Sequence, residues 1–147
     1  STDARTVPPV NAAPDCIFCG IVAGTIASTT IARTERAIAF MDIHPLTTGH
    51  TLVIPRRHVT DLLDADGAVA EVSGLLESTG RLLVDRLGAD GINVFQASRA
   101  PAGQTVFHLH FHVIPRYEAA GFRFHGQPVA DPEELAVAAA AIREHLD

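Results

Sequence analysis

The stretch GQTVFHLHFHVIPR, residues 103–116, places histidines at three alternate positions, His108, His110 and His112. Alternate residues of a β-strand project to the same face, at a spacing of roughly 7 Å. The three imidazoles would therefore form a row along one face of a strand. The other face would carry apolar side chains, those of Phe107, Leu109, Phe111 and Val113. This pattern predicts a strand with one face in the core and one face used for chemistry.

The histidine row has three interpretations. A half-exposed strand can carry polar residues on its solvated face without any function. A catalytic three-histidine zinc site is the second, but the outer histidines of one straight strand lie roughly 13 Å apart. The third makes His110 a nucleophile toward phosphorus, with its neighbours fixing its tautomer and binding the phosphate. Possible phosphate donors precede the row and favour the third interpretation: Ser98, Arg99, Gly103, Gln104 and Thr105.

Composition restricts the class of protein. A chain of 147 residues with 47% hydrophobic residues suffices for one compact domain. The net charge of -6 and the scattered basic residues argue against a surface for long nucleic acid. No apolar run approaches the roughly 20 residues of a membrane helix, and no leader pattern opens the chain. These features predict a cytoplasmic protein without a membrane partner.

The order of elements predicts an α+β fold. Residues 1–14 are rich in Pro, Ala and small polar residues, which is typical of a disordered arm, so the domain is expected to span 15–147. Strands are expected within 30–43 (one or two), 49–57, 91–98 and 103–116. Helices are expected near 16–24, over 61–87 as the one long amphipathic helix ended by Gly88, and over 131–146 with Asp131 as N-cap.

Cys16 and Cys19 are the only cysteines, and they form a Cys-x-x-Cys pair. The pair lacks the strand-then-helix setting of a thioredoxin-like redox motif. Two thiolates at this spacing supply half of a tetrahedral zinc site. Two buried free thiols are the alternative.

The chain resembles the histidine triad (HIT) family, in the form of its small nucleoside phosphoramidase-like branch. The triad stretch carries the family signature, His-x-His-x-His followed by two apolar residues. Three further matches lie in CIFCGIVAG (16–24), AFMDIHP (39–45) and GHTLVIPRRH (49–58). The resemblance covers residues 16–117 and implies an antiparallel sheet of about five strands in a two-fold dimer.

The resemblance also implies a role for each matched position. His110 would attack the α-phosphorus of a nucleotide and hold it as a nucleotidyl-imidazole. His112 would bind the phosphate and protonate the leaving group, while His108 and His50 would support the site. Asp42 would accept the ribose hydroxyls. Apolar walls of the base pocket would come from Phe40, Ile43, Ile17, Phe18 and Leu52.

The resemblance implies structural zinc as well, because members that keep the cysteine pair complete it with two histidines. The matching positions are His58 and His108. At Ala97–Arg99 the chain departs from the family, which usually carries Asn and Gly there; Ser98 is a candidate replacement donor. His44 receives no role.

The expected activity is transfer of a nucleotidyl group to His110 and then to water, releasing a nucleoside monophosphate without a cofactor in the chemical step. Purine nucleoside phosphoramidates or acyl nucleotides are the expected substrates. A dinucleoside polyphosphate hydrolase is one alternative. A nucleotide-binding or scaffold protein with incidental hydrolysis is the other.

Overall fold

A computed structural model describes residues 12–122 and 128–144. The predicted disordered arm, 1–14, therefore falls almost entirely outside the described residues. The helices are α1 (Ile17–Ala23), α2 (Ala68–Leu87) and α3 (Pro132–Glu144), with short 3-10 turns at Leu62–Asp64, Ala100–Ala102 and Glu118–Ala120. The strands are β1 (Thr30–Arg33), β2 (Ala37–Met41), β3 (Thr51–Pro55), β4 (Gly91–Phe95) and β5 (Phe111–Arg116).

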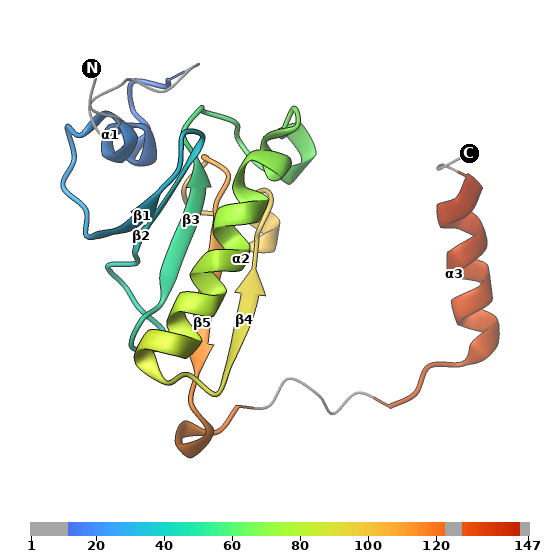
Figure 1. Cartoon of the computed structure of the whole chain (residues 1–147). Coiled ribbons are helices and arrows are strands. Elements are labelled where there is room, and N and C mark those ends of the chain that lie inside the picture. The colour runs from blue at the N-terminus through green and yellow to red at the C-terminus, as the bar shows by residue number, and fades with distance from the viewer. Residues whose placement is uncertain (1–11, 123–127, 145–147) are drawn as a thin grey trace.

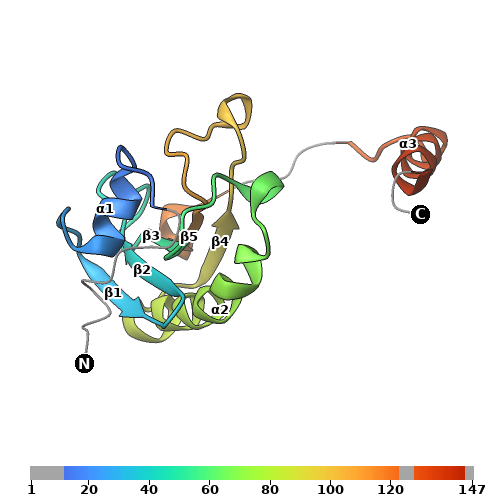
Figure 2. The ribbon, with the colours of Figure 1, turned by 90° about the horizontal axis from the view of Figure 1, so that it is seen from above.

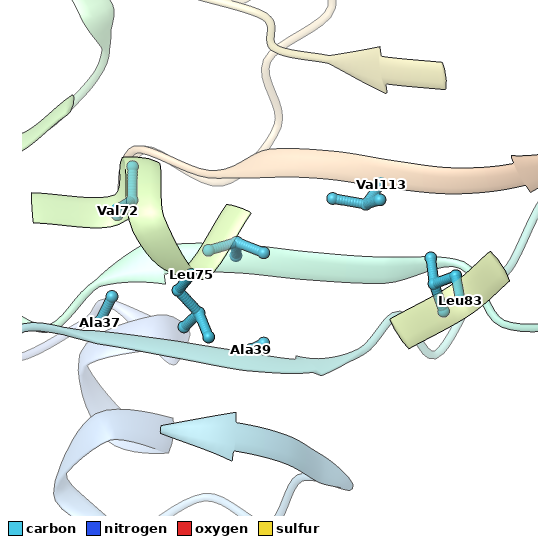
Figure 3. Packing of buried hydrophobic residues seen from close by; sticks show 7 residues of the cluster. Ala37, Ala39, Val72, Leu75, Leu83 and Val113 are labelled. Carbon is cyan, nitrogen blue, oxygen red and sulfur yellow. The ribbon is translucent and has the colours of Figure 1, made fainter. Parts of the chain in front are cut away.

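The five strands form one antiparallel sheet in the order β1-β2-β3-β5-β4, which confirms the predicted α+β fold. Helix α2 lies along one face and α1 covers the other (Figure 1, Figure 2). Alternation along β2 divides its side chains between the two layers. Ala37 and Ala39 pack under α2 (Figure 3), whereas Ile38 and Phe40 pack against α1. The central strands are thus buried on both faces.

Helix α2 presents an apolar stripe to the sheet. Its buried residues are Ala68, Val72, Leu75, Thr79, Gly80 and Leu83. Gly88 ends the helix in the left-handed conformation, with φ of 69°, as the sequence predicted. The predicted start at Asp61 is wrong, because the carboxylate of Asp61 instead caps the 3-10 turn by accepting from the N–H groups of Leu63 and Asp64. Leu62 and Leu63 are consequently exposed rather than part of the helix stripe.

The histidine stretch is only partly a strand. β5 begins at Phe111, and its pairing with β3 stops at the register Val53↔Phe111. Ahead of this point, a ring N–H of His108 bonds to the carbonyl of Pro55 and replaces the next ladder contact. The predicted apolar face is correspondingly incomplete: Leu109 is fully buried, but Phe107 is 49% exposed.

Helix α3 begins as predicted, since the side chain of Asp131 accepts from the N–H of Glu133. The helix stands apart from the sheet (Figure 1, Figure 2), and its Leu135, Val137 and Ile142 are exposed. Within the described residues, no helix has the length and apolar character that a membrane crossing requires.

Candidate active site and metal centre

His110 is held with one defined ring nitrogen free. Its Nδ1 lies 2.7 Å from the carbonyl oxygen of His108, and a carbonyl can only accept, so Nδ1 carries the proton. The lone pair is therefore on Nε2. His110 is 6% exposed, and burial lowers its pKa, although the bond to His108 and the charge of Asp42 oppose the shift. The imidazole is thus neutral at pH 7, the form that can act as a nucleophile.

His50 and His112 form a directional hydrogen-bond chain. The backbone N–H of Leu46 donates to Nδ1 of His50 over 3.0 Å, so the proton of His50 lies on Nε2. That nitrogen is 2.9 Å from Nδ1 of His112, which must accept. The single proton of neutral His112 consequently lies on Nε2. This chain therefore leaves a donor on Nε2 of His112, next to the lone pair that the His108 carbonyl leaves on Nε2 of His110.

Burial keeps both imidazoles of this chain neutral in the free protein. Burial, followed by His110 and His50, lowers the pKa of His112 to about 4. Burial also lowers the pKa of His50. One Asp42 carboxylate oxygen lies 3.4 Å from Nε2 of His50 and 3.9 Å from Nδ1 of His112, so it is placed to stabilise a proton that arrives on this pair.

A pocket of about 590 Å³ opens beside the histidines. Its volume falls within the range of roughly 300–1,000 Å³ that is usual for small-molecule sites. The lining includes every apolar residue predicted for the base pocket, namely Ile17, Phe18, Phe40, Ile43 and Leu52, together with Asp42, Thr105, His110 and His112. The fold thus brings these predicted residues together around one pocket.

Part of the pocket wall consists of residues that were not predicted from the sequence. Further lining residues are Ile21, Ile26, Ala27, Ser28, Met41, His44 and Val106. Ile21 was within reach of sequence reasoning, because it lies four residues after Ile17 on the same helix face. The segment 26–28 carried no such signal. It reaches the pocket through the turn after α1, where Gly24 has a φ of 82°.

The second cluster brings Cys16, Cys19, His58 and His108 together. Nδ1 of His108 lies 3.5 and 3.6 Å from the sulfurs of Cys16 and Cys19, and Nδ1 of His58 lies 3.3 Å from that of Cys19. A tetrahedral zinc ion with ordinary bond lengths separates its sulfur and nitrogen ligands by about 3.6 Å. Nε2 of His108 donates to the carbonyl of Pro55 over 2.8 Å, so its Nδ1 lone pair faces the thiols. The donor set, spacing and tautomer all fit zinc.

A second group of possible metal ligands consists of Asp42, His50 and His112, which are also close enough to surround an ion. The hydrogen bonds of His50 argue against metal binding at this group. A neutral histidine that ligates through Nε2 must carry its proton on Nδ1, yet Nδ1 of His50 accepts the backbone N–H of Leu46. The tautomer of His50 therefore does not suit metal binding at this group.

Comparison with known proteins identifies the family. The HIT domain model matches residues 23–119, well over half of the chain. The chain belongs to the HIT domain family. The HIT relatives include Protein hit of Bacillus subtilis, which is 35% identical over 142 residues covering 93% of this chain and 98% of its own. Adenosine 5'-monophosphoramidase hnt1 of Schizosaccharomyces pombe is 35% identical over 82% of this chain and 90% of its own.

Solved HIT structures share the fold. A crystal structure of a HIT family member from Bacillus subtilis gives a TM-score of 0.81 at 34% identity, over 90% of this chain and 98% of that one. A zinc-bound histidine triad family protein from Mycobacterium smegmatis gives a TM-score of 0.71 at 37% identity, with the same coverage of the two chains.

Ser98 lies in the loop at Ala97–Arg99 that departs from the HIT family pattern, and it does not line the pocket. The Ser98 hydroxyl accepts the backbone N–H of Leu62 over 3.1 Å and exchanges hydrogen bonds with the amide of Gln96. Gly103, also predicted to face the phosphate, ends the 3-10 turn with a φ of 102°. Neither residue lines the pocket, so in this conformation both shape the loop.

Gln104 is 3% exposed and supports the same loop. Its amide nitrogen donates to the carbonyls of Thr60 and Val106, and its oxygen accepts the backbone N–H of Arg99. Among the predicted phosphate donors of this loop, only Thr105 lines the pocket.

Proposed function

We propose that the protein is a nucleoside phosphoramidase that works through a nucleotidyl-histidine intermediate. The observation that carries this proposal is the pair of complementary nitrogens at the pocket: the Nε2 lone pair of His110 and the Nε2–H of His112. Such a pair supplies a nucleophile and a donor to one phosphorus centre. The monophosphoramidase name of the fission yeast relative supports the same activity.

The pocket would orient the nucleotide from both ends. Apolar walls would hold the base, and the Asp42 carboxylate would accept the ribose hydroxyls. One Asp42 oxygen already accepts the N–H of His44 over 2.8 Å, which fixes the orientation of the carboxylate. The α-phosphate would then lie against His110 and His112.

In the first step, Nε2 of His110 bonds to phosphorus and the phosphorus–nitrogen bond of the substrate breaks. When the anionic phosphate binds, His112 takes up a second proton from solvent at Nδ1, and the Nε2–H of His50 turns to Asp42. His112 then gives its Nε2 proton to the leaving nitrogen. In the second step, the same Nε2 takes a proton from water, whose oxygen bonds to phosphorus as the bond to His110 breaks. The products are an amine and a nucleoside monophosphate. The Nδ1 proton of His112 returns to solvent when the product leaves.

Side-by-side hydrolysis of adenosine 5'-phosphoramidate and a diadenosine polyphosphate tests this function. We expect faster phosphoramidate turnover and a loss of at least about 10³-fold in kcat for His110→Ala, because the covalent route is gone. His44→Ala is the matched control, since His44 lines the pocket but makes no triad contact.

Two other results of this comparison would each point to a different function. Preference for the polyphosphate would keep the mechanism and make the protein a dinucleoside polyphosphate hydrolase. Nucleotide binding without turnover of either substrate would contradict the enzyme proposal and favour a binding or scaffold role.

We also propose that Cys16, Cys19, His58 and His108 hold one structural zinc ion, with no part in the chemical step. Metal analysis of protein purified without chelator should give one zinc per chain. The Asp42 group should add no second ion, because the His50 tautomer excludes it. Protein without zinc would contradict the proposal, and a second tightly bound ion would contradict the tautomer assignment.

We propose a homodimer, formed through β4 and the adjoining surface of α2. β4 is an edge strand, and its Ile92, Val94 and Phe95 are 37%, 50% and 51% exposed. A groove between the strand and the helix is lined by Gly80, Val84 and Ile92, among others. Unpaired strand edges and apolar patches of this kind are typical of protein–protein contacts.

A further inference from the structure

Helix α1 is shared between the metal centre and the nucleotide pocket. Cys16 is its N-cap and Cys19 lies in its first turn, and both face the metal centre. Ile17, Phe18 and Ile21 belong to the same helix and line the pocket. A helix of seven residues is too short to be stable by itself, so its position depends on what it contacts.

Phe18 connects the two sites through ring contacts. Its ring centroid lies 6.0 Å from that of the metal-centre residue His108 and 5.2 Å from that of the nucleophile His110, both in edge-on geometry. It also packs edge-on against Phe40 at 5.4 Å, on the pocket wall. Phe18 is 5% exposed, so movement of α1 would change this packing.

His108 makes a second connection within one residue. Its ring faces the thiols, and its backbone carbonyl accepts the Nδ1–H of His110 over 2.7 Å. The group that binds the metal and the group that sets the nucleophile's tautomer are therefore joined by a few covalent bonds. A shift of the ring toward or away from a metal would move the carbonyl that orients His110.

We infer that metal binding at Cys16, Cys19, His58 and His108 and nucleotide binding in the pocket are cooperative, with Phe18 and His108 carrying the coupling. The inference rests on the proposed function, because it assigns a regulation to the same pocket. The metal fixes α1 and the His108 carbonyl in the arrangement that the nucleotide needs. Linkage requires the effect to be mutual: bound nucleotide must tighten metal binding by the same factor.

Zinc affinity of the full chain, measured by competition with a chromophoric chelator, tests the coupling without prior removal of the metal. AMP serves as the probe because the proposed reaction releases it and does not consume it. Saturating AMP should tighten zinc binding by about 5- to 150-fold, the usual range for coupled sites. Calorimetric AMP affinities of zinc-loaded and zinc-free protein should differ by the same factor.

Two variants separate positioning from simple loss of affinity. Phe18→Leu keeps all four metal ligands, so its zinc affinity without AMP should stay within about twofold of wild type, while the coupling factor falls toward one. Ile43→Ala is the matched control: Ile43 lines the pocket but is 85% exposed and distant in sequence from the metal ligands. It should weaken AMP binding and leave the coupling factor unchanged.

The outcomes distinguish this inference from the proposed function. Zinc affinity that is indifferent to AMP, in protein that binds AMP and hydrolyses phosphoramidate, would overturn the coupling alone. An unchanged coupling factor in Phe18→Leu would remove Phe18 from the connection. Zinc-loaded protein that neither binds AMP nor turns over phosphoramidate would overturn the proposed function and this inference together.

Discussion

The histidines of the candidate sites differ in which ring nitrogen carries the proton, and this difference suits them to different proposed roles. His108 and His110 each use one N–H on a backbone carbonyl, but His108 does so through Nε2 and His110 through Nδ1. The free lone pairs therefore point to the thiols in one case and to the pocket in the other. His112 accepts at Nδ1 from His50 and so presents a donor instead.

The identities of these residues were predictable from the sequence, but their proton positions were not. Spacing and family resemblance pointed to His50, His58 and the triad. The tautomer of His108 is set by the carbonyl of Pro55, 53 residues before it, and that of His112 by His50. Nearby backbone groups set the tautomers of His110 and His50, but only in the side-chain orientations that the fold imposes. Loop residues Ser98 and Gln104 were likewise visible as polar candidates, whereas their bonds to the backbone of Leu62 and Thr60 appear only in the fold.

The pH dependence of kcat/KM should follow the neutral form of His110 in the free protein. Burial lowers the pKa of His110 from 6.5, so the nucleophile stays unprotonated throughout the range above that value. We expect an acid limb, where His110 becomes protonated, whose midpoint lies below 6.5. A midpoint above 6.5, in profiles corrected for substrate ionisation, would contradict the assigned environment.

At the scale of elements, the sheet and helices were predictable because their apolar periodicities are strong. The two misplaced boundaries have a common cause, which is hydrogen bonding by side chains to the backbone. Asp61 caps a short turn, so the helix predicted to start there begins only at Ala68, and the imidazole of His108 takes a carbonyl that a strand would otherwise use. The spacing of apolar residues does not reveal where a side chain competes with the backbone for hydrogen bonds.

The loop before β5 contains a strained residue. Arg99 has φ of 75° and ψ of 153°, a region that favours glycine strongly. Its guanidinium approaches the buried carboxylate of Asp61 only to 3.9 Å and is 62% exposed, so the ion pair offsets little of the strain.

Arg99→Gly should therefore stabilise the protein by about 1 kcal/mol, which corresponds to a rise of roughly 2–4 °C in Tm. Arg99→Ala is the control, because it removes the same guanidinium but keeps a Cβ in the strained conformation. Thermal unfolding followed by circular dichroism measures both variants. Equal melting temperatures for the glycine and alanine variants would show that the backbone is not the source of strain.

At the scale of the whole molecule, the free edge of β4 lies close to the chemistry. Phe95 is the last residue of this strand, and its ring centroid lies 5.6 Å from that of His112. A second copy docked on the edge would shield this side of the triad from water. The proposed dimer would therefore affect the candidate active site as well as the stability of the protein.

Val94→Lys should convert the protein to a monomer, because a lysine on an exposed edge opposes pairing with another strand. Sedimentation velocity at several concentrations gives the mass of wild type and variant. Ala119→Lys adds the same positive charge on an exposed 3-10 turn outside the groove and should leave the wild-type mass unchanged. A wild type that sediments as a single chain would refute the dimer.

The proposed zinc ligands also impose an order on biosynthesis. Cys16 and His108 are 92 residues apart, so the metal centre joins an early part of the nascent chain to a late one. At the usual synthesis rate, this interval lasts about 5–20 s. During that time α1, which forms part of the pocket wall, has emerged from the ribosome, but His108, a proposed ligand of the same zinc ion, has not yet been synthesised. Helix α1 is thus translated before the last of its proposed metal ligands. Until His108 is made, the thiols are exposed on an unfinished chain and would be vulnerable to oxidation.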